Sequence, residues 1–163
     1  GLGIYAVRLG RLEMAAVVVV NALGVIFGPE NGKKIAGLRS EDGSGFADTR
    51  EELYKLSKRT DMFTGNTTIG AVITNGKFSK AEMNKIASMT RNAYARCINP
   101  VGTLADGDTI YAASVGDVEA DINVAGTLAA QVMERAIVNG HIPPASLHMG
   151  LDNLIFICLF WMI

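Results

Sequence analysis

The chain has 163 residues, which predicts a single domain with room for a sizeable core. Apolar residues make up 49% of the sequence and charged residues 19%, and the formal net charge is -1. This composition is typical of a core-rich globular protein, and the charge balance argues against a nucleic-acid partner or a membrane partner.

Cysteine and histidine are too sparse to predict a metal site or a disulfide framework. Cys97 and Cys158 are interpreted as buried thiols of a protein in a reducing compartment, so we expect a cytoplasmic location. His141 and His148 have no acidic or cysteine neighbour at zinc-binding spacing and are interpreted as surface or loop residues. We therefore predict neither a metal nor another cofactor.

The first part of the chain predicts strands. The β-branched run Val17–Val20 is apolar on both faces, which is typical of a strand buried on both sides. The apolar residues 24–27 are expected to continue this strand, and the turn signal at residues 29–32 predicts a hairpin. The predicted strands of this part are residues 4–9, 14–21 and 33–36.

Three helices are predicted from their end signals. Two of them begin where a serine or threonine stands three positions before a glutamate, which is the spacing of a capping box. The third has an apolar face of helical period and is stopped by Gly140. The capping pairs are Thr49 with Glu52 and Ser79 with Glu82. The predicted helices cover residues 49–59, 79–97 and 122–139.

Two further strands, at residues 67–74 and 109–115, alternate with these helices. The apolar tail at residues 154–163 is about half as long as a membrane-spanning helix, so we interpret it as a buried final strand or helix. Strands in hairpin groups with amphipathic helices between them predict layered α/β (α+β) packing rather than a regular βαβ repeat.

A small polar turn, Gly65-Asn66-Thr67-Thr68, leads directly into the strand at residues 67–74. A threonine hydroxyl is a poor nucleophile without a base, but an N-terminal threonine can use its own α-amine, which titrates at about 7.7 to 8.0. That base suits a sequence with no histidine near the turn. The Thr67 hydroxyl would first have to attack the Asn66 carbonyl and cut the chain there. An ordinary turn with a hydroxyl cap explains the same residues.

Two other segments carry side chains that suit such a site. Asn21 ends the most apolar strand, where its amide would donate to an oxyanion or simply form a strand-ending turn. Asp106 and Asp108 flank a glycine just before a strand, where they would orient an ammonium group or form a solvated turn. A calcium loop is excluded because the later ligands of that motif are missing from the sequence.

Together these segments resemble the DmpA-like family, which contains the L-aminopeptidase/D-esterase enzymes and the β-peptidyl aminopeptidases. The resemblance extends to the helices at residues 79–96 and 125–136. It implies a self-cleaving hydrolase of the N-terminal nucleophile type, a four-layer αββα sandwich, and a homo-oligomer that is commonly a tetramer. The matching segments are residues 19–24, 66–75 and 106–112.

The resemblance also assigns roles to residues. Cleavage before Thr67 would make this residue the nucleophile, and Asn21 matches the asparagine of the family's oxyanion hole. The backbone N–H of Thr68 is expected as a second oxyanion donor. Asp106 and Asp108 lie where some members carry other polar residues, and they would hold the ammonium group of Thr67 or of the substrate. The substrate would be a small peptide, amide or ester.

Departures from the family leave alternatives open. The first half of family members has no counterpart here, so residues 1–163 are expected to be one domain from the C-terminal part of a longer precursor. The region from His141 onward does not resemble the family. One alternative is an acyltransferase that resembles ornithine acetyltransferase, which shares the self-cleaving threonine and a similar fold. Another is an inactive, uncleaved piece with a structural or assembly role.

Overall fold

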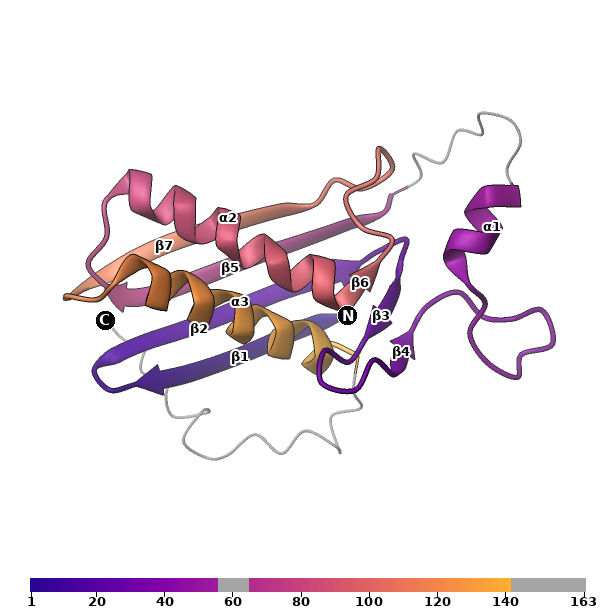
Figure 1. Cartoon of the computed structure of the whole chain (residues 1–163), viewed down its shortest axis with the longest axis horizontal. Coiled ribbons are helices and arrows are strands. Elements are labelled where there is room, and N and C mark those ends of the chain that lie inside the picture. The colour runs from indigo at the N-terminus through magenta and orange to yellow at the C-terminus, as the bar shows by residue number, and fades with distance from the viewer. Residues whose placement is uncertain (56–64, 142–163) are drawn as a thin grey trace.

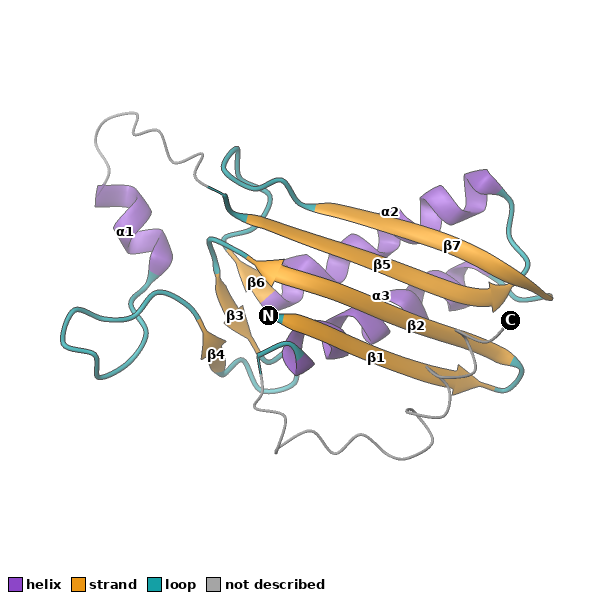
Figure 2. Ribbon diagram, turned by 180° about the vertical axis from the view of Figure 1, so that it is seen from behind, coloured by secondary structure: helices purple, strands orange, loops and turns teal. Residues whose placement is uncertain are grey.

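A computed structural model describes residues 1–55 and 65–141, and its main body is one sheet covered on one face by two long helices (Figure 1). The sheet has the strand order β1-β2-β5-β7, and its other face is turned to the viewer in Figure 2. The predicted layered α/β packing is therefore confirmed. The elements of this body are β1 (Leu2–Leu9), β2 (Leu12–Asn21), β5 (Thr67–Gly76), β7 (Thr109–Val118), α2 (Lys80–Cys97) and α3 (Ile122–Asn139).

The strand connections bring distant segments to one edge of the sheet. β1 and β2 form an antiparallel hairpin, and β2 pairs antiparallel with β5. β5 and β7 are parallel, which requires a crossover, and α2 supplies it across the helical face. Consequently the end of β2 and the starts of β5 and β7 lie side by side, as both ribbon views show.

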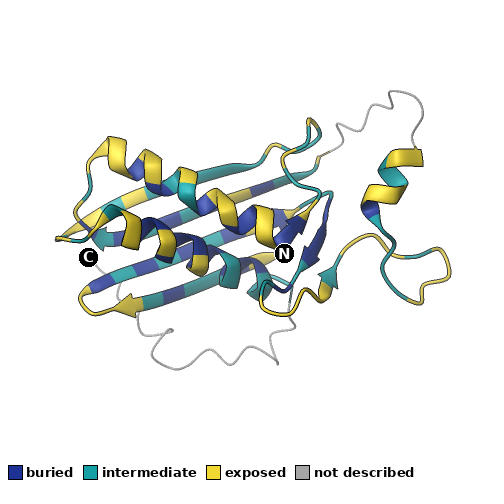
Figure 3. Cartoon of the chain, in the orientation of Figure 1, coloured by how far each residue is buried: buried dark blue, intermediate teal, exposed yellow. Residues whose placement is uncertain are grey.

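Alternation along β2 shows which face of the sheet is covered. Met14, Ala16 and Val18 are fully buried in the core beneath the helices. Val19 lies on the other face and is 53% exposed, and the alternating colours of the strands in Figure 3 follow this pattern. The prediction of burial on both sides is therefore wrong, because the described residues cover only the helical face.

The core lies between this sheet and its two helices. Full burial of a large apolar side chain contributes about 1.5–3 kcal/mol, so the residues buried on the helical face supply much of the free energy that favours folding. The predicted apolar stripe of α2 is confirmed and ends at Cys97, a buried free thiol whose pKa is raised by burial to about 12. Large, fully buried core residues are Tyr94, Ile86, Ile98, Met133, Ile137, Val72 and Val132.

A second, smaller sheet has the strand order β4-β3-β6 and contains β3 (Val25–Phe27), β4 (Lys34–Ala36) and β6 (Ile98–Asn99). It confirms the predicted hairpin, which forms between β3 and β4. The prediction that residues 24–27 continue β2 is wrong. Gly24 packs so closely on the chain after α2 that an added Cβ would lie 2.1 Å from the Pro100 carbonyl oxygen. This close backbone approach takes the chain into the second sheet.

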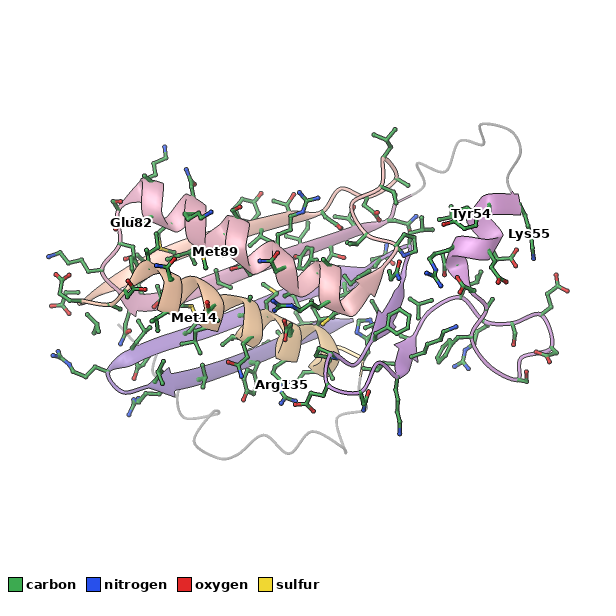
Figure 4. All side chains as sticks on the ribbon, in the orientation of Figure 1. Met14, Tyr54, Lys55, Glu82, Met89 and Arg135 are labelled. Carbon is green, nitrogen blue, oxygen red and sulfur yellow. The ribbon has the colours of Figure 1, made fainter. Side chains whose placement is uncertain are left out.

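The helix starts differ in how well their caps were predicted. At α2 both hydrogen bonds of the box formed by Ser79 and Glu82 are present, and Figure 4 labels Glu82 at that end. The short helix α1 (Thr49–Lys55) is capped instead by Asp48, whose carboxylate accepts a first-turn backbone N–H at 2.9 Å. The predicted box at Thr49 is wrong because Thr49 is already helical, and its buried hydroxyl has no partner among the described residues.

Some predictions concern residues outside the described ranges. These are the part of the first predicted helix that runs to Arg59, the predictions for His148 and Cys158, and the apolar tail at residues 154–163. α3 ends at Gly140 as predicted, and His141 lies in the turn that follows, where burial lowers the pKa of its imidazole. None of the described helices is long and apolar enough to cross a membrane.

Candidate active site

The predicted site residues meet at the edge of the sheet where β2 ends and β5 and β7 begin (Figures 1 and 2). In the β2–β5 ladder Asn21 stands directly opposite Thr67. On the other side of β5, an isolated parallel bridge pairs Asn66 with Asp106. The antiparallel pairing thus places Asn21 beside Thr67, and the parallel bridge places Asp106 beside Asn66. Both partners therefore lie next to the peptide bond between Asn66 and Thr67.

The Thr67 hydroxyl contacts the carbonyl group that it would have to attack. Its Oγ1 donates a hydrogen bond to the carbonyl oxygen of Asn66 at 2.6 Å. The side chain is half-buried because it starts β5 between two neighbouring strands. The hydroxyl is therefore held against the peptide group that precedes it by the strand geometry.

Asn21 binds the same incoming segment one residue earlier. Its Nδ2 donates to the carbonyl oxygen of Gly65 at 2.5 Å. Its amide is thus next to the Asn66–Thr67 bond but is not on the Asn66 carbonyl. In the continuous chain this donor is occupied, and it would become free if the segment ending at Asn66 moved away.

Asp108 contacts Thr68, the residue of β5 that follows Thr67. Its Oδ1 accepts the backbone N–H of Thr68 at 2.8 Å, so that N–H is also occupied in the continuous chain. Burial, with a smaller contribution from the charge of Asp106, raises the pKa of the Asp108 carboxyl, although the Thr68 N–H opposes the shift. The site therefore holds a half-buried carboxylate without a cationic partner among the described contacts.

Asp106 points its carboxylate into its own loop. Its Oδ2 accepts the Thr103 N–H at 2.9 Å and the Thr103 hydroxyl at 2.8 Å. These bonds close the turn before β7 and shape the backbone that pairs with Asn66. Asp106 and Asp108 are thus close in sequence but have different contacts, since only Asp108 reaches the backbone of β5.

Two residues at the site were not predicted. The Gly107 N–H donates to the Asn66 carbonyl oxygen at 3.2 Å, and a Cβ at position 107 would lie 2.9 Å from Thr67 Oγ1. Tyr94 of α2 contacts the start of β7 from the helical face of the sheet, where its hydroxyl donates to the Thr109 carbonyl oxygen at 3.2 Å. Burial raises the pKa of Tyr94, which keeps it a proton donor. The position of Gly107 between two aspartates was a sequence signal that could have indicated a role in the site. Tyr94 had no such signal, because its place in the apolar stripe of a helix indicated only a core residue.

The described residues offer little for binding a metal ion. No three histidine, cysteine, aspartate or glutamate side chains gather in the described ranges as a metal-binding group would. The arrangement instead combines a hydroxyl, an amide, a carboxylate and backbone N–H groups around one peptide bond. These groups can supply a nucleophile, oxyanion donors and a negative charge for an ammonium group.

Comparison with solved structures shows the fold of this body. The chain is similar to the L-aminopeptidase D-Ala-esterase/amidase from Ochrobactrum anthropi, described as a variant of the Ntn hydrolase fold, with a TM-score of 0.53 and 15% identity. The match covers 86% of this chain and 39% of that one. The PH0078 protein from Pyrococcus horikoshii OT3 gives the same TM-score at 17% identity over the same shares. The predicted resemblance to N-terminal nucleophile hydrolases is therefore confirmed for the fold.

Sequence comparison finds relatives that are much longer than this chain. A 6-aminohexanoate-oligomer endohydrolase of Kocuria sp. (strain KY2) is 31% identical over 114 residues, which is 69% of this chain and 32% of that protein. An uncharacterized aminopeptidase of Mycobacterium tuberculosis is 31% identical over 149 residues, which covers 79% of this chain and 43% of the relative. The chain thus spans about a third to two fifths of the length of these relatives.

The family assignment rests on most of the sequence. Residues 4–149 match the profile of peptidase family S58, a range that includes the site at Asn21, Thr67 and Asp108. This match agrees with the DmpA-like resemblance of the three segments, but it runs on to residue 149, so the prediction that the resemblance stops at His141 is wrong for residues 141–149. The chain therefore belongs to peptidase family S58.

Proposed function

We propose that the chain carries the nucleophile of an aminopeptidase-type hydrolase, which it generates by cutting its own backbone between Asn66 and Thr67. The observation that carries the proposal is the contact between Thr67 Oγ1 and the Asn66 carbonyl oxygen at 2.6 Å. It is supported by the family membership and by relatives named as aminopeptidases.

The first reaction is an acyl shift within the chain. Thr67 Oγ attacks the Asn66 carbonyl carbon, the C–N bond breaks, and the hydroxyl proton ends on the Thr67 nitrogen, which becomes an α-amine. Water then hydrolyses the ester, which leaves a carboxylate on Asn66 and a free hydroxyl on Thr67. The product is a threonine whose own amine serves as the base near neutral pH.

Turnover would use the groups that cleavage releases. The Thr67 amine accepts the hydroxyl proton during attack on the substrate carbonyl and returns it to the leaving amine, which leaves the acyl group as an ester on Thr67 Oγ. Water, deprotonated by the same amine, then hydrolyses this ester and restores the hydroxyl. Asn21 Nδ2 loses its Gly65 partner when the upstream segment moves away, and the Thr68 N–H becomes free when Asp108 turns from it to an ammonium group; together these two donors would stabilise the tetrahedral oxyanion. Asp108 would hold the Thr67 ammonium or the free amine of the substrate, while Asp106 shapes the loop beside it.

The substrate class that suits this chemistry is a small peptide, amide or ester. Two kinds of substrate would distinguish an aminopeptidase from an oligomer hydrolase. They are p-nitroanilides of amino acids with a free amine, and the 6-aminohexanoate oligomers that some relatives are named for. Acetyl transfer to glutamate is the reaction of the acyltransferase alternative. Release of p-nitroaniline without acetyl transfer is the result we expect.

Intact mass spectrometry of the purified chain tests the proposal. We expect two polypeptides, residues 1–66 and 67–163, and a single uncut chain for Thr67→Ala. Thr67→Ser is the matched control because it retains a hydroxyl. A wild-type chain that folds, stays uncut and hydrolyses nothing would instead support the structural or assembly role.

A further inference from the structure

The scissile carbonyl has a second hydrogen-bond donor besides the nucleophile. The Asn66 carbonyl oxygen accepts the Thr67 hydroxyl at 2.6 Å and the Gly107 N–H at 3.2 Å. During attack the hydroxyl gives up its proton and becomes the nucleophile, so it stops being a donor to this oxygen. Negative charge develops on the same oxygen at that moment.

The other donors at the site are committed elsewhere in the continuous chain. Asn21 Nδ2 binds the Gly65 carbonyl oxygen, and the Thr68 N–H binds Asp108. Among the described residues, the Gly107 N–H is therefore the donor that remains on the Asn66 oxygen. We propose that this N–H stabilises the oxyanion of the self-cleavage step, an inference that rests on the proposed function.

The loop holds this donor in place before the reaction. The parallel bridge pairs Asn66 with Asp106, the residue before Gly107. The Asp106 carboxylate is bound to the N–H and hydroxyl of Thr103, and the Gly107 carbonyl accepts the Thr109 hydroxyl at 3.2 Å. A fixed backbone donor needs no reorganisation when charge develops, and a hydrogen bond to an anion is shorter and stronger than one to a neutral carbonyl.

Glycine at position 107 has a steric reason rather than a conformational one. Gly107 is not among the glycines with a left-handed φ, so its backbone conformation is open to other residues. However, an added Cβ would lie 2.9 Å from Thr67 Oγ1 and would press the hydroxyl away from the Asn66 carbonyl. The absence of a side chain lets the donor and the nucleophile share one carbonyl group.

The decisive experiment replaces the N–H itself. Gly107→glycolic acid, introduced by nonsense suppression during cell-free synthesis, changes the amide to an ester and deletes the donor without adding a side chain. We expect self-cleavage, followed by intact mass spectrometry, to slow by about 10²- to 10³-fold. Gly32→glycolic acid is the control, because it deletes an N–H that donates to Gly28 at 2.8 Å in a turn outside the site.

A second variant tests the close approach without touching the N–H. Gly107→Ala should slow self-cleavage by about tenfold or more, because the added Cβ would displace the Thr67 hydroxyl. A tenfold change in rate corresponds to about 1.4 kcal/mol in the activation free energy. Gly45→Ala is its control, because Gly45 has an ordinary φ and open space around it. Thermal unfolding followed by circular dichroism verifies that each variant is folded.

Each outcome has a distinct meaning. Slow cleavage in both Gly107 variants, with wild-type rates in both controls, supports the inference. If the wild-type chain splits and the folded Gly107→glycolic acid variant splits within threefold of its rate, the inference is overturned while the proposed function stands. If neither the wild-type chain nor Thr67→Ser ever splits, the proposed function fails and the inference fails with it.

Discussion

The two ends of the β2–β5 ladder carry the same kinds of side chain and use them differently. At the far end the Thr74 hydroxyl donates to the Glu13 carbonyl oxygen at 2.8 Å and accepts the Gly76 N–H at 3.0 Å. Asn75 binds the backbone of Glu13 and of Arg11 there. These threonine and asparagine groups therefore bind the sheet itself, and they close its edge.

At the near end the equivalent groups bind a segment that is about to enter the sheet. The Thr67 hydroxyl and the Asn21 amide both contact carbonyl groups of residues 65–66. The buried Thr68 hydroxyl has no partner among the described residues, and Asp108 is half-buried. The difference shows that residue type alone does not mark a site. What distinguishes the near end is that its donors contact two consecutive carbonyl groups just before Thr67, whereas those of the far end contact the strands themselves.

The largest expected effect comes from exchanging the two threonines for residues without a hydroxyl. Thr67→Ala should abolish both the split at residue 66 and all hydrolysis, because the nucleophile is gone. Thr74→Val should leave the split intact but lower the free energy of unfolding by about 1–3 kcal/mol, since it leaves buried backbone groups without a partner. Mass spectrometry and urea unfolding measure the two effects.

This contrast would break if the threonines behaved alike. Splitting of the Thr67→Ala chain at the same bond would show that another group cuts it. Loss of splitting in a folded Thr74→Val chain would show that the far end also contributes to the reaction.

The two asparagines offer the next contrast. Asn21→Ala should lower kcat for an amino-acyl p-nitroanilide by about 10²- to 10³-fold, because an oxyanion donor is lost. Self-cleavage should slow less, since Asn21 lies on the Gly65 carbonyl and not on the Asn66 carbonyl. Asn75→Ala is the matched control and should change stability alone. Equal effects of Asn21→Ala on both reactions would contradict this division of roles.

Asp108 should give a smaller effect that depends on pH. With its pKa raised by burial, the ionised form that holds an ammonium group is lost at a higher pH than for an ordinary aspartate. The acid limb of the kcat/KM profile should therefore contain two ionisations, that of Asp108 and that of the Thr67 amine, which titrates at about 7.7 to 8.0. Asp108→Asn should lower kcat/KM by about 10²-fold, remove the Asp108 ionisation from the limb and leave that of the amine. The same number of ionisations in the variant as in the wild type would assign the second one to another group.

The same shift makes a prediction about stability with a definite sign. The folded state binds the Asp108 proton more tightly than the unfolded state does, because its pKa is raised. Its contribution to stability is therefore present at low pH and is lost as pH rises through the raised pKa. In the uncut Thr67→Ala chain, Asp108→Asn should consequently raise the stability at neutral pH and lose this advantage in acid, as urea unfolding at the two pH values would show.

Local features of the fold were predictable from sequence, and long-range ones were not. The capping box at Ser79 is local, because both of its partners lie within one turn. The neighbouring Asp48 and Thr49 can each cap a helix, and only the structure shows which of them does. The departure of β3 from β2 depends on Gly24 meeting the chain near Pro100, far away in sequence. Such contacts leave no local signal.

The candidate site shows the same division. Asn21, Thr67 and Asp108 stand out by motif, and the strand register explains why they meet. Their partners in the continuous chain, such as the Gly65 carbonyl for Asn21, depend on distances of a few ångströms that no spacing encodes. Gly107 was visible between two aspartates, but its value depends on a contact with Thr67 across two strands.

The smallest expected effect lies at the structural end of the ladder. Ser79 caps α2 just beyond β5: its hydroxyl accepts the Glu82 N–H, and the Glu82 carboxylate accepts the Ser79 N–H. Ser79→Ala should cost about 1 kcal/mol and lower Tm by about 2–4 °C for a chain of this size. Because the cap is remote from residue 66, splitting should keep its wild-type rate. A slower split with an unchanged Tm would mean that the crossover helix transmits strain to the nucleophile, so the two ends would no longer be separable.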